Sequence, residues 1–332
     1  MVGIDLEHEL ICPACRASLG AREGGLRCAG CARAFADVAG LRDLRLESDR
    51  YLDLPDERAK AERLRAIEPT TDLMGLASAY YAITDDVLDA RRGRFLRHIA
   101  SAEARGEALV EGLPRAGRIL EIGCGTGGLL VAAARRGLAI AGVDIASRWL
   151  VVARRRLADH GLAVPLFAAS VERLPWADGT FDAVVADSVV EHLDEPARAL
   201  SECARVLRPE GTLLVWSPNR YTLATDPHVG LWGVGWLPRH WLPAYLKLRG
   251  RDVWPPRTLS AFEALRLAAA SGWSEVDIDV PRIPESWARS RGWTERAAIR
   301  AYSAARSGRA TRGVLRAVGP LWELRAVKKG AA

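Results

Sequence analysis

The sequence predicts an α/β fold preceded by a small module that contains four cysteines, and three observations support this expectation. From about residue 116, short apolar runs alternate with stretches whose apolar residues recur every three or four positions, as strands and helices do in an α/β protein. One run ends in a glycine-rich turn that leads into a further apolar stretch. Near the N-terminus, four cysteines form two equally spaced pairs. We therefore expect a small module over 1–45, a linker and helical lid segment over 46–115, and a main domain over 116–332.

The expected strands are apolar runs, and the expected helices follow the 3.6-residue period. Strands are expected over 118–122, 139–143, 164–169, 181–186, 212–217 and 276–280, with a last alternating segment that begins at Trp322. Helices are expected between them and over a long stretch from about 72 to 113. Asp194 precedes Pro196 as a helix cap, and Ser260 with Glu263 matches a capping box.

The composition is that of an ordinary globular protein. Hydrophobic residues make up 49% and charged residues 27% of the 332 residues. We expect no membrane span, since no apolar run reaches about 18 residues, and no signal sequence, so a cytoplasmic location is the default. The net charge of +6 is compatible with an anionic partner such as RNA. However, only four of the 47 basic residues are lysine, and we interpret the dispersed arginines, including the run 154–156, as codon bias on solvated helix faces.

The four N-terminal cysteines predict a metal site. Cys12 and Cys15 form one CxxC pair, and Cys28 and Cys31 form a second pair twelve residues later. Two such turns facing each other place four thiolates in a tetrahedron around Zn²⁺. Two disulfides or a redox pair are the alternatives, but the expected reducing compartment favours zinc. Because all four ligands would be cysteine, the site has no open position, so we expect a structural zinc ion.

The glycine-rich turn predicts a nucleotide-binding loop. It follows the strand expected over 118–122 and lets backbone amides approach a ligand closely before the next helix begins. The next expected strand ends on Asp144, whose carboxylate can accept both hydroxyls of a ribose. The spacing of Gly123, Gly125 and Gly128 also satisfies the dinucleotide fingerprint, so the glycines alone leave an NAD(P)-binding domain open.

Five segments together resemble, in order and in spacing, the motifs of class I S-adenosylmethionine-dependent methyltransferases. These segments are 121–127, Asp144, 174–182, 189–192 and 205–214. The resemblance implies a Rossmann-like sheet of seven strands with helices on both faces, an antiparallel pair at its C-terminal end, and S-adenosyl-L-methionine as the cofactor. The cysteine module is similar to the zinc ribbons of tRNA-methyltransferase activator proteins and of some methyltransferases.

The resemblance also implies a set of cofactor-binding residues. They are Glu121, Gly123, Gly125 and Gly127 at the methionine half, Asp144 with Ile145 at the ribose, Ser170 and Val171 at the adenine, and Asp187 at the methionine amino group or the substrate. Ser170 departs from the aspartate that many relatives carry there, although a serine can still make one hydrogen bond.

Two histidines and a tryptophan-rich insertion are the candidates for the substrate side. His192, just beyond the fourth expected strand, is placed to act as a base or only to order its loop. The insertion over 218–257 carries Asp226 and His228 as polar contacts, with His228 expected to position the substrate. It also contains four tryptophans: Trp232, Trp236, Trp241 and Trp254. They either cap the active site or anchor an irregular segment to the core.

Three functions are compatible with these patterns. The first is methylation of oxygen or nitrogen in a small-molecule biosynthetic intermediate, which the stretch 189–192 and the aromatic insertion favour. The second is an RNA base methyltransferase whose ribbon binds RNA, although the basic residues form no cluster and the fourth strand lacks an amino-methylation signature. The third, a non-catalytic scaffold, is disfavoured by the intact glycine and ribose motifs. Neither the methyl acceptor nor the oligomeric state follows from these patterns.

Overall fold

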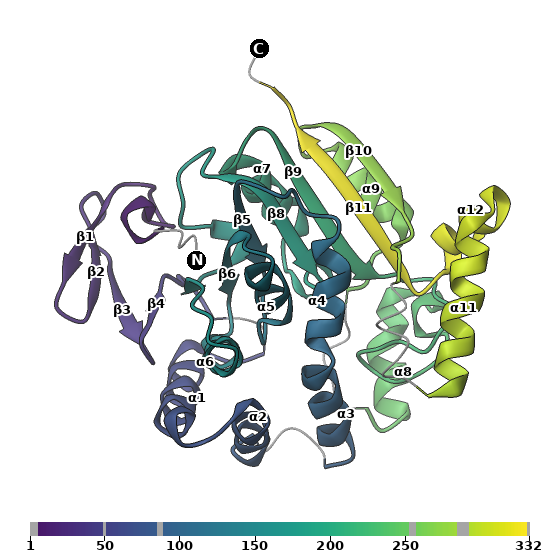
Figure 1. Cartoon of the computed structure of the whole chain (residues 1–332), viewed down its shortest axis with the longest axis horizontal. Helices are drawn as coiled ribbons and strands as arrows, with labels where there is room; N and C mark the ends of the chain where they lie inside the picture. The colour runs from purple at the N-terminus through teal and green to yellow at the C-terminus, as the bar shows by residue number, and fades with distance from the viewer. Residues whose placement is uncertain (1–5, 49–50, 85–88, 252–256, 284–291, 331–332) are drawn as a thin grey trace. The chain divides into compact units, whose positions relative to one another are not determined.

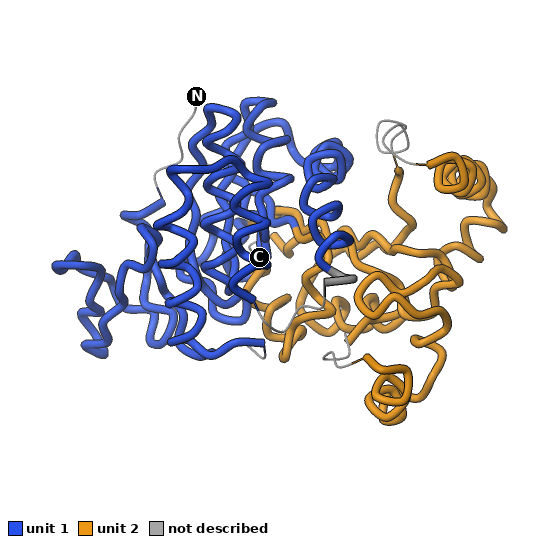
Figure 2. Tube along the Cα trace, turned by 90° about the horizontal axis from the view of Figure 1, so that it is seen from below, with its two compact units in different colours: residues 1–185, 205–208 blue, residues 186–204, 209–332 orange. Residues whose placement is uncertain are grey.

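The computed structural model describes residues 6–48, 51–84, 89–251, 257–283 and 292–330. The chain divides into two compact units (Figure 2): unit 1 comprises residues 1–185 and 205–208, and unit 2 comprises residues 186–204 and 209–332. These units group residues by packing, whereas the predicted division at residues 45 and 115 follows chain order and stays a prediction.

Unit 1 is built on a sheet whose central part is parallel. Its strands are β1 (Leu19–Arg22), β2 (Gly25–Cys28), β3 (Ala34–Val38), β4 (Leu41–Asp43), β5 (Arg118–Ile122), β6 (Ala139–Asp144), β7 (Leu166–Ala168) and β8 (Phe181–Asp187), whose last two residues belong to unit 2. Their order is β1-β2-β3-β4-β7-β6-β5-β8. Pairing is antiparallel from β1 to β4 and parallel from β4 through β7 and β6 to β5. The segment β7-β6-β5-β8 has the order of a doubly wound sheet, which confirms the predicted α/β class.

The parallel strands are nearly continuous apolar runs because helices cover them. The side chains of β5 and β6 are buried except at their first residues. Figure 1 shows α4 (Ala102–Val110), α5 (Gly128–Arg135) and α6 (Ser147–Asp159) on one face of these strands. Gly142 is needed for this packing, since a Cβ there would lie 2.8 Å from both Cys124 Sγ and Leu130 Cδ1.

The segment between β4 and β5 is helical but broken. It contains α1 (Leu54–Ile67), α2 (Leu73–Ala82), α3 (Asp89–Ala100) and α4, with the 3-10 turn η2 (Glu68–Thr70), while a further 3-10 turn, η1 (Glu7–Glu9), precedes β1. The helical stretch expected from about 72 to 113 therefore consists of three helices. Helices α4 and α5 cross closely, since a Cβ at Gly106 would lie 2.6 Å from the carbonyl oxygen of Gly128.

Unit 2 contains the antiparallel end of the predicted sheet. Strand β9 (Leu207–Pro218), whose first two residues belong to unit 1, pairs antiparallel with β11 (Leu321–Lys328), which pairs antiparallel with β10 (Trp273–Asp279). The other elements are η4 (Val190–His192), α7 (Pro196–Val206, whose last two residues belong to unit 1), η5 (Val234–Trp236), η6 (Arg239–Trp241), α8 (Leu242–Leu248), α9 (Ala261–Ala269), α11 (Trp293–Ser307) and α12 (Arg309–Val318). The antiparallel pair expected at the C-terminal end is thus confirmed.

The structure confirms some of the predicted helix starts and corrects others. The capping box is confirmed: Ser260 Oγ accepts from Glu263 N at 3.2 Å, and Glu263 Oε2 accepts from Ser260 N at 2.8 Å. The expected cap at Asp194 is one residue too early, since α7 begins at Pro196. Helices α11 and α12 were not expected, because their alanine- and arginine-rich segments bury only Tyr302. Among the described helices, none has the length and apolar character needed to cross a bilayer.

Candidate functional site

The glycine-rich loop lies at the carboxyl end of β5, where parallel α/β sheets bind their ligands. Gly123, Gly125 and Gly127 have φ values of +62°, +48° and +75°, a region that favours glycine. A Cβ on Gly125 would meet no atom within 4 Å, so the loop has open space beyond this residue. Helix α5 then begins at Gly128 and directs its N-terminus at the loop. Glu121, the fourth residue of β5, is buried beneath it.

Asp144 joins the glycine loop to the loop after β6. Its Oδ2 accepts a hydrogen bond from Gly125 N at 2.8 Å, and its Oδ1 accepts from Ala146 N at 2.8 Å. The side chain is therefore held from two directions at the tip of its strand. Ile145 follows it and is half-buried. The structure thus brings Asp144 and Ile145 beside the glycine loop, in the arrangement expected from the sequence.

Ser170 and Val171 lie at the end of the third parallel strand. Ala169 N donates to the carbonyl oxygen of Asp144 at 3.0 Å, so the loop after β7 is tied to the end of β6. Ser170 caps η3 (Val171–Arg173), because its Oγ accepts from Glu172 N at 3.2 Å. The hydroxyl hydrogen of Ser170 remains available as a donor, while Val171 is buried. The residues expected at the adenine therefore lie at the same edge of the sheet as Asp144 and the glycine loop.

A buried arginine that the sequence interpretation missed also holds the glycine loop. Arg156, on α6, is 1% exposed, and its guanidinium donates to the carbonyl oxygen of Thr126 at 2.7 Å and to that of Ile99 at 2.6 Å. Glu103 balances its charge at 3.1 Å. Burial lowers the pKa of Arg156, and Glu103 opposes this shift. The prediction that the 154–156 run lies on a solvated face is therefore wrong for Arg156, because its partners are distant in sequence.

The four N-terminal cysteines converge as predicted. Cys12 Sγ lies 3.7 Å from Cys31 Sγ, and Cys15 Sγ lies 3.4 Å from Cys28 Sγ. Disulfides are excluded at these distances, and all four thiols are free. Sulfur atoms around a tetrahedral zinc ion lie about 3.8 Å apart, given Zn–S bonds of about 2.3 Å. The donor set and its spacing therefore fit zinc.

Backbone amides favour the thiolate form of Cys28, the form that binds a metal. Cys31 N and Gly30 N both donate to Cys28 Sγ at 3.3 Å. The hydrogen bond from Cys31 N, with smaller contributions from the neighbouring groups, lowers the pKa of Cys28 to about 6. The buried Cys12 has its pKa raised to about 12 by desolvation. A bound metal would have to displace the proton from Cys12.

The N-terminal cysteine module, residues 1–45 and called the ribbon below, is hydrogen-bonded to the main sheet of unit 1 through its last strand. Strand β4 pairs with β7, and Leu44 N donates to the carbonyl oxygen of Ala168 at 2.7 Å. On the other side, Arg118 forms a two-point ion pair with Glu9, at 2.6 and 2.8 Å. The ribbon is thus part of unit 1, and its exit strand lies next to the strand that precedes Ser170.

In unit 2, β8 ends on the expected Asp187, and a turn follows. Ser188 Oγ donates to Asp187 Oδ1 at 3.1 Å, and Ser188 N donates to the carbonyl oxygen of Trp216 at 2.8 Å. Ser188 has a φ of +58°, which is strained for a residue other than glycine. Such strain is often found at functional sites, and here it turns the chain sharply into η4, which carries His192.

His192 and His228 come together although they lie 36 positions apart in the sequence. Their ring centroids are 5.0 Å apart in an edge-on arrangement. His228 lies between two carboxylates: its Nε2 is 3.6 Å from Glu191 Oε1, and its Nδ1 is 3.6 Å from Asp226 Oδ1. Asp226 also closes the turn, since its Oδ1 accepts from His228 N at 2.8 Å and from Val229 N at 3.0 Å. The insertion thus supplies one histidine and its orienting carboxylate.

Glu191 completes this cluster and was not among the predicted site residues. Its side chain is fully buried, and Ser217 Oγ donates to its Oε2 at 2.9 Å. Burial raises the pKa of Glu191, an effect that the charge of His228 only partly offsets. For Asp226 burial acts in the same direction, but the hydrogen bonds from His228 and Val229 outweigh it and leave the pKa lowered. The two carboxylates around His228 therefore have opposite pKa shifts.

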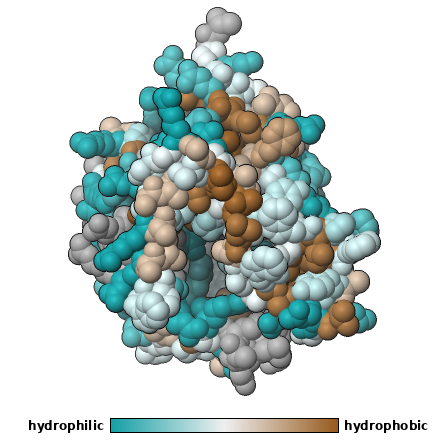
Figure 3. Space-filling model, turned by 90° about the vertical axis from the view of Figure 1, so that its right-hand side faces the viewer, coloured by the Kyte–Doolittle hydropathy of each residue, from teal (hydrophilic) through white to brown (hydrophobic). Residues whose placement is uncertain are grey.

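The three described tryptophans of the insertion do not anchor it to the core. Trp232, Trp236 and Trp241 are largely exposed, and the indole N–H groups of Trp232 and Trp236 donate to the carbonyl oxygens of Leu223 and Thr222. Aliphatic residues form the small core instead: Val229, Leu231, Val234 and Leu246. The anchoring alternative is therefore wrong for these three tryptophans, and Trp254 lies outside the described residues. Figure 3 shows apolar residues on the surface at the side that carries α11 and α12.

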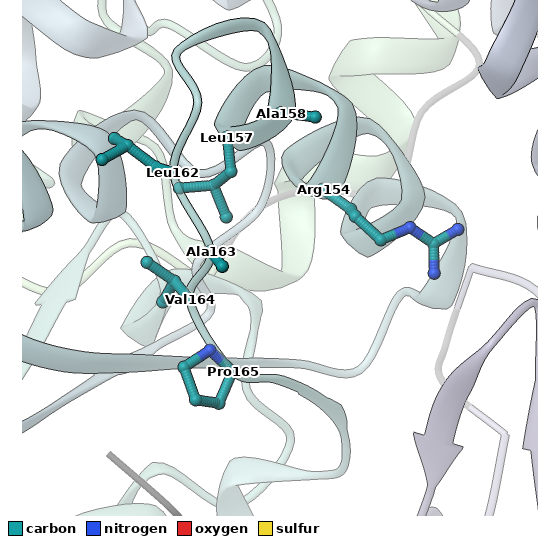
Figure 4. Close-up of a pocket in the computed structure, with 7 residues that line it drawn as sticks. All are labelled: Arg154, Leu157, Ala158, Leu162, Ala163, Val164 and Pro165. Carbon is teal, nitrogen blue, oxygen red and sulfur yellow. The ribbon is translucent and has the colours of Figure 1, made fainter. Parts of the chain in front are cut away.

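Two further features of unit 1 are a buried tyrosine pair and a surface hollow. Tyr80 and Tyr81 are buried by helix packing, with the Tyr80 ring 4.3 Å from that of Trp149 on α6. A hollow of about 450 Å³ lies at the C-terminal end of α6 and the segment before β7 (Figure 4). Its lining is mainly apolar and includes Leu157, Leu162 and Val164. None of the predicted cofactor residues lines it, so it is separate from the glycine loop.

Comparisons with known proteins match this chain to methyltransferases. Residues 120–215 match the family model of a methyltransferase domain. A ubiquinone biosynthesis O-methyltransferase of Methylocella silvestris is 34% identical over 205 residues, which cover 57% of this chain and 73% of that protein. A protein of the same description from Parvibaculum lavamentivorans is 36% identical over 125 residues, covering 37% of this chain and 49% of that protein. Geranyl diphosphate C-methyltransferase of Streptomyces coelicolor, a solved structure, has a TM-score of 0.44 and 19% identity, covering 68% of this chain and 75% of that chain.

Proposed function

The chain belongs to the class I S-adenosylmethionine-dependent methyltransferases, and we propose that it methylates an oxygen or nitrogen atom of a small-molecule biosynthetic intermediate. The observation that carries this proposal is the cluster of His192, His228, Glu191 and Asp226, which can take up a proton from an acceptor. The similarity to ubiquinone biosynthesis O-methyltransferases supports a hydroxyl acceptor.

We assign cofactor binding to the loops of unit 1 and to Asp187, the last residue of β8. The open, left-handed glycine loop would hold the methionine half above Glu121, and Gly123, Gly125 and Gly127 let the backbone approach it. The Asp144 carboxylate can accept the ribose hydroxyls while it keeps its two backbone hydrogen bonds, because each oxygen has a further lone pair. Ile145, Ser170 and Val171 would line the adenine. Asp187 would bind the methionine amino group or the substrate.

The bound cofactor supplies an activated methyl group, so the protein mainly has to position the acceptor and remove its proton. We propose His192 as the base, with its imidazole accepting the hydroxyl proton. Both ring nitrogens of His228 face carboxylate oxygens, which suits a positioning role better than proton uptake from the acceptor. Asp226 would fix the His228 loop, and Glu191 would hold the ring from the other side.

We assign the four cysteines to one structural zinc ion per chain. Cys12, Cys15, Cys28 and Cys31 would be its ligands, which leaves no position for a substrate or water. The zinc would stabilise a ribbon whose own apolar core is small. Its role in this proposal is structural, and no step of methyl transfer involves it.

Radiolabel transfer tests the proposed acceptor class. The purified chain is incubated with methyl-labelled S-adenosylmethionine and either a fractionated metabolite pool, a panel of phenols and catechols, or deproteinised RNA. We expect label in small molecules, and we expect it to persist at about 0.3 M salt, because recognition does not depend on phosphate contacts. The Asp144→Ala variant serves as the control for transfer that depends on the cofactor site. Labelling of RNA that falls steeply with salt, with inert metabolites, would establish the RNA alternative instead.

A further inference from the structure

A salt-bridged pair in the segment that leaves the ribbon reaches the cofactor site of unit 1. Arg45 donates to Asp43 through Nε at 2.7 Å and through a terminal nitrogen at 2.8 Å, which is a two-point pair. Both side chains are buried, with 2% of the Arg45 side chain and none of that of Asp43 exposed. The remaining terminal nitrogen of Arg45 donates to the carbonyl oxygen of Ile145 at 2.9 Å. The pair thus links β4 to the loop after β6.

The contacted carbonyl belongs to the peptide group that holds Asp144. The N–H of Ala146, which donates to Asp144 Oδ1 at 2.8 Å, lies in the same peptide plane as the carbonyl of Ile145. A peptide group is rigid and planar, so fixing the direction of its C=O also fixes the direction of its N–H. A hydrogen bond from a guanidinium further polarises that peptide and strengthens the bond that its N–H donates. Arg45 therefore orients one of the two backbone N–H groups that hold the Asp144 carboxylate, the other being that of Gly125.

From this arrangement we infer that Arg45, oriented by Asp43, is a positioning residue for cofactor binding, and that the ribbon's exit strand is a working part of the cofactor site. The inference rests on the proposed ribose-binding role of Asp144. The ribbon places the pair: β3 and β4 are paired, β4 is paired with β7, and Arg45 lies two residues beyond the end of β4. This gives the N-terminal ribbon a function in the reaction without an RNA partner.

The alternative is a purely structural ion pair. Buried pairs can be replaced by uncharged residues of similar volume with little change in stability, whereas removing one partner leaves an uncompensated charge. The double variant Asp43→Asn with Arg45→Met therefore removes the contact to Ile145 while it keeps the site filled. Arg58→Met is the matched control. Arg58 donates to the same Asp43 at 2.8 Å, but its side chain is 40% exposed and has no contact to Ile145.

The test is calorimetric binding of S-adenosylhomocysteine, with adenosine as a second ligand and thermal unfolding as the fold control. We expect the double variant to raise Kd for both ligands about 10-fold, the loss that follows when one charge-assisted hydrogen bond is removed. Under turnover, KM for S-adenosylmethionine should rise while kcat at saturation stays within about 2-fold, as for a lost binding interaction. Arg58→Met should leave both Kd values within about 2-fold of the wild type, because it keeps Arg45 in place.

Arg45→Lys gives a second route, since it keeps the charge but cannot make the two-point pair and reach Ile145 together. We expect it to weaken S-adenosylhomocysteine binding in the same direction, and this variant decides the question if the double variant does not fold. A folded double variant or Arg45→Lys variant that binds like the wild type would overturn the inference. A wild-type chain that fails to bind S-adenosylhomocysteine would instead overturn the cofactor site itself.

Discussion

The cofactor loops of unit 1 and the insertion of unit 2 are held in place by different means. In unit 1, buried side chains fix individual peptide groups: Arg156 holds Thr126, Arg45 holds Ile145, and Asp144 holds Gly125 and Ala146. In unit 2, the insertion is held by the Asp226 turn, by a core of four aliphatic residues, and by Arg220 and Arg239, which both donate to Glu263 of α9. Three of its tryptophans are largely exposed. The cofactor loops are therefore held by buried side chains that fix single peptide groups, whereas the insertion also presents exposed aromatic side chains.

This difference matches the demands on the two regions. A cofactor is the same in every reaction cycle, so rigid loops lower the cost of binding it. The insertion is the region in which substrate specificity can change at low cost, because replacing its exposed residues disturbs few contacts. The following predictions test whether the two regions differ in this way.

Removing the metal ligands should have the largest effect, and it should be local. Cys12→Ser with Cys28→Ser should abolish binding of about one zinc ion per chain, because it removes two of the four proposed ligands. The effect should be large, since structural zinc contributes about 10–16 kcal/mol of apparent binding free energy. Metal analysis and hydrogen exchange measure this. We expect fast exchange in β1, β2 and β3, with β5 and β6 still protected. Zinc retained by the variant, or no zinc in freshly reduced wild-type protein, would contradict the assignment.

His192→Ala and His228→Ala should separate the roles in the acceptor cluster. Loss of a general base lowers kcat by roughly 10²–10⁴-fold, whereas loss of a positioning residue mainly raises KM for the acceptor. We expect the first behaviour for His192 and the second for His228. Steady-state kinetics with varied acceptor distinguish them. A reversed pattern would make His228 the base and His192 the residue that orders the loop.

Arg156→Ala should destabilise unit 1 by about 2–4 kcal/mol, because the carbonyl oxygens of Thr126 and Ile99 lose their buried donor, while Glu103 keeps His160 as a partner. The control is the adjacent Arg155→Ala. Arg155 forms an exposed ion pair with Asp159, which lies one helical turn away, and such pairs contribute about 0.3–0.5 kcal/mol. Urea unfolding followed by circular dichroism measures both. Similar losses of unfolding free energy in the two variants would show that Arg156 contributes no more to stability than an exposed ion pair does.

Glu191→Gln should produce a smaller change, seen in the pH dependence of stability. Burial raises the pKa of Glu191 above its ordinary value of 4.5, so the folded chain binds more protons than the unfolded chain just above that pH. The wild-type contribution is therefore present below pH 4.5 and is lost as the pH rises through the folded-state pKa. Glutamine does not titrate, so the variant should lack this decline in urea unfolding curves. Parallel pH profiles would argue against a strongly shifted Glu191.

The sequence predicted those parts of the molecule that depend on the local backbone. A glycine loop needs left-handed residues, a zinc ribbon needs two CxxC turns, and a capping box needs Ser260 and Glu263 at fixed spacing. Contacts between distant residues left no local pattern. Arg156 has the same neighbours in sequence as a solvated arginine, and only the packing of α4 against α6 reveals Glu103 as its partner. Likewise, Asp43 and Arg45 lie about a hundred residues before the peptide that they hold.

A direct test of the account is S-adenosylhomocysteine binding to three chains in the same calorimetric experiment: wild type, Asp144→Ala and His192→Ala. We propose that the ribose of the cofactor is bound in unit 1 and that the proton is removed in unit 2. Asp144→Ala should therefore weaken binding by about 1.5–3 kcal/mol, the value of hydrogen bonds to a charged group. His192→Ala should bind like the wild type, although it is defective in turnover. Unchanged affinity in Asp144→Ala, or wild-type chains that prefer NAD, would contradict the assignment of the two regions.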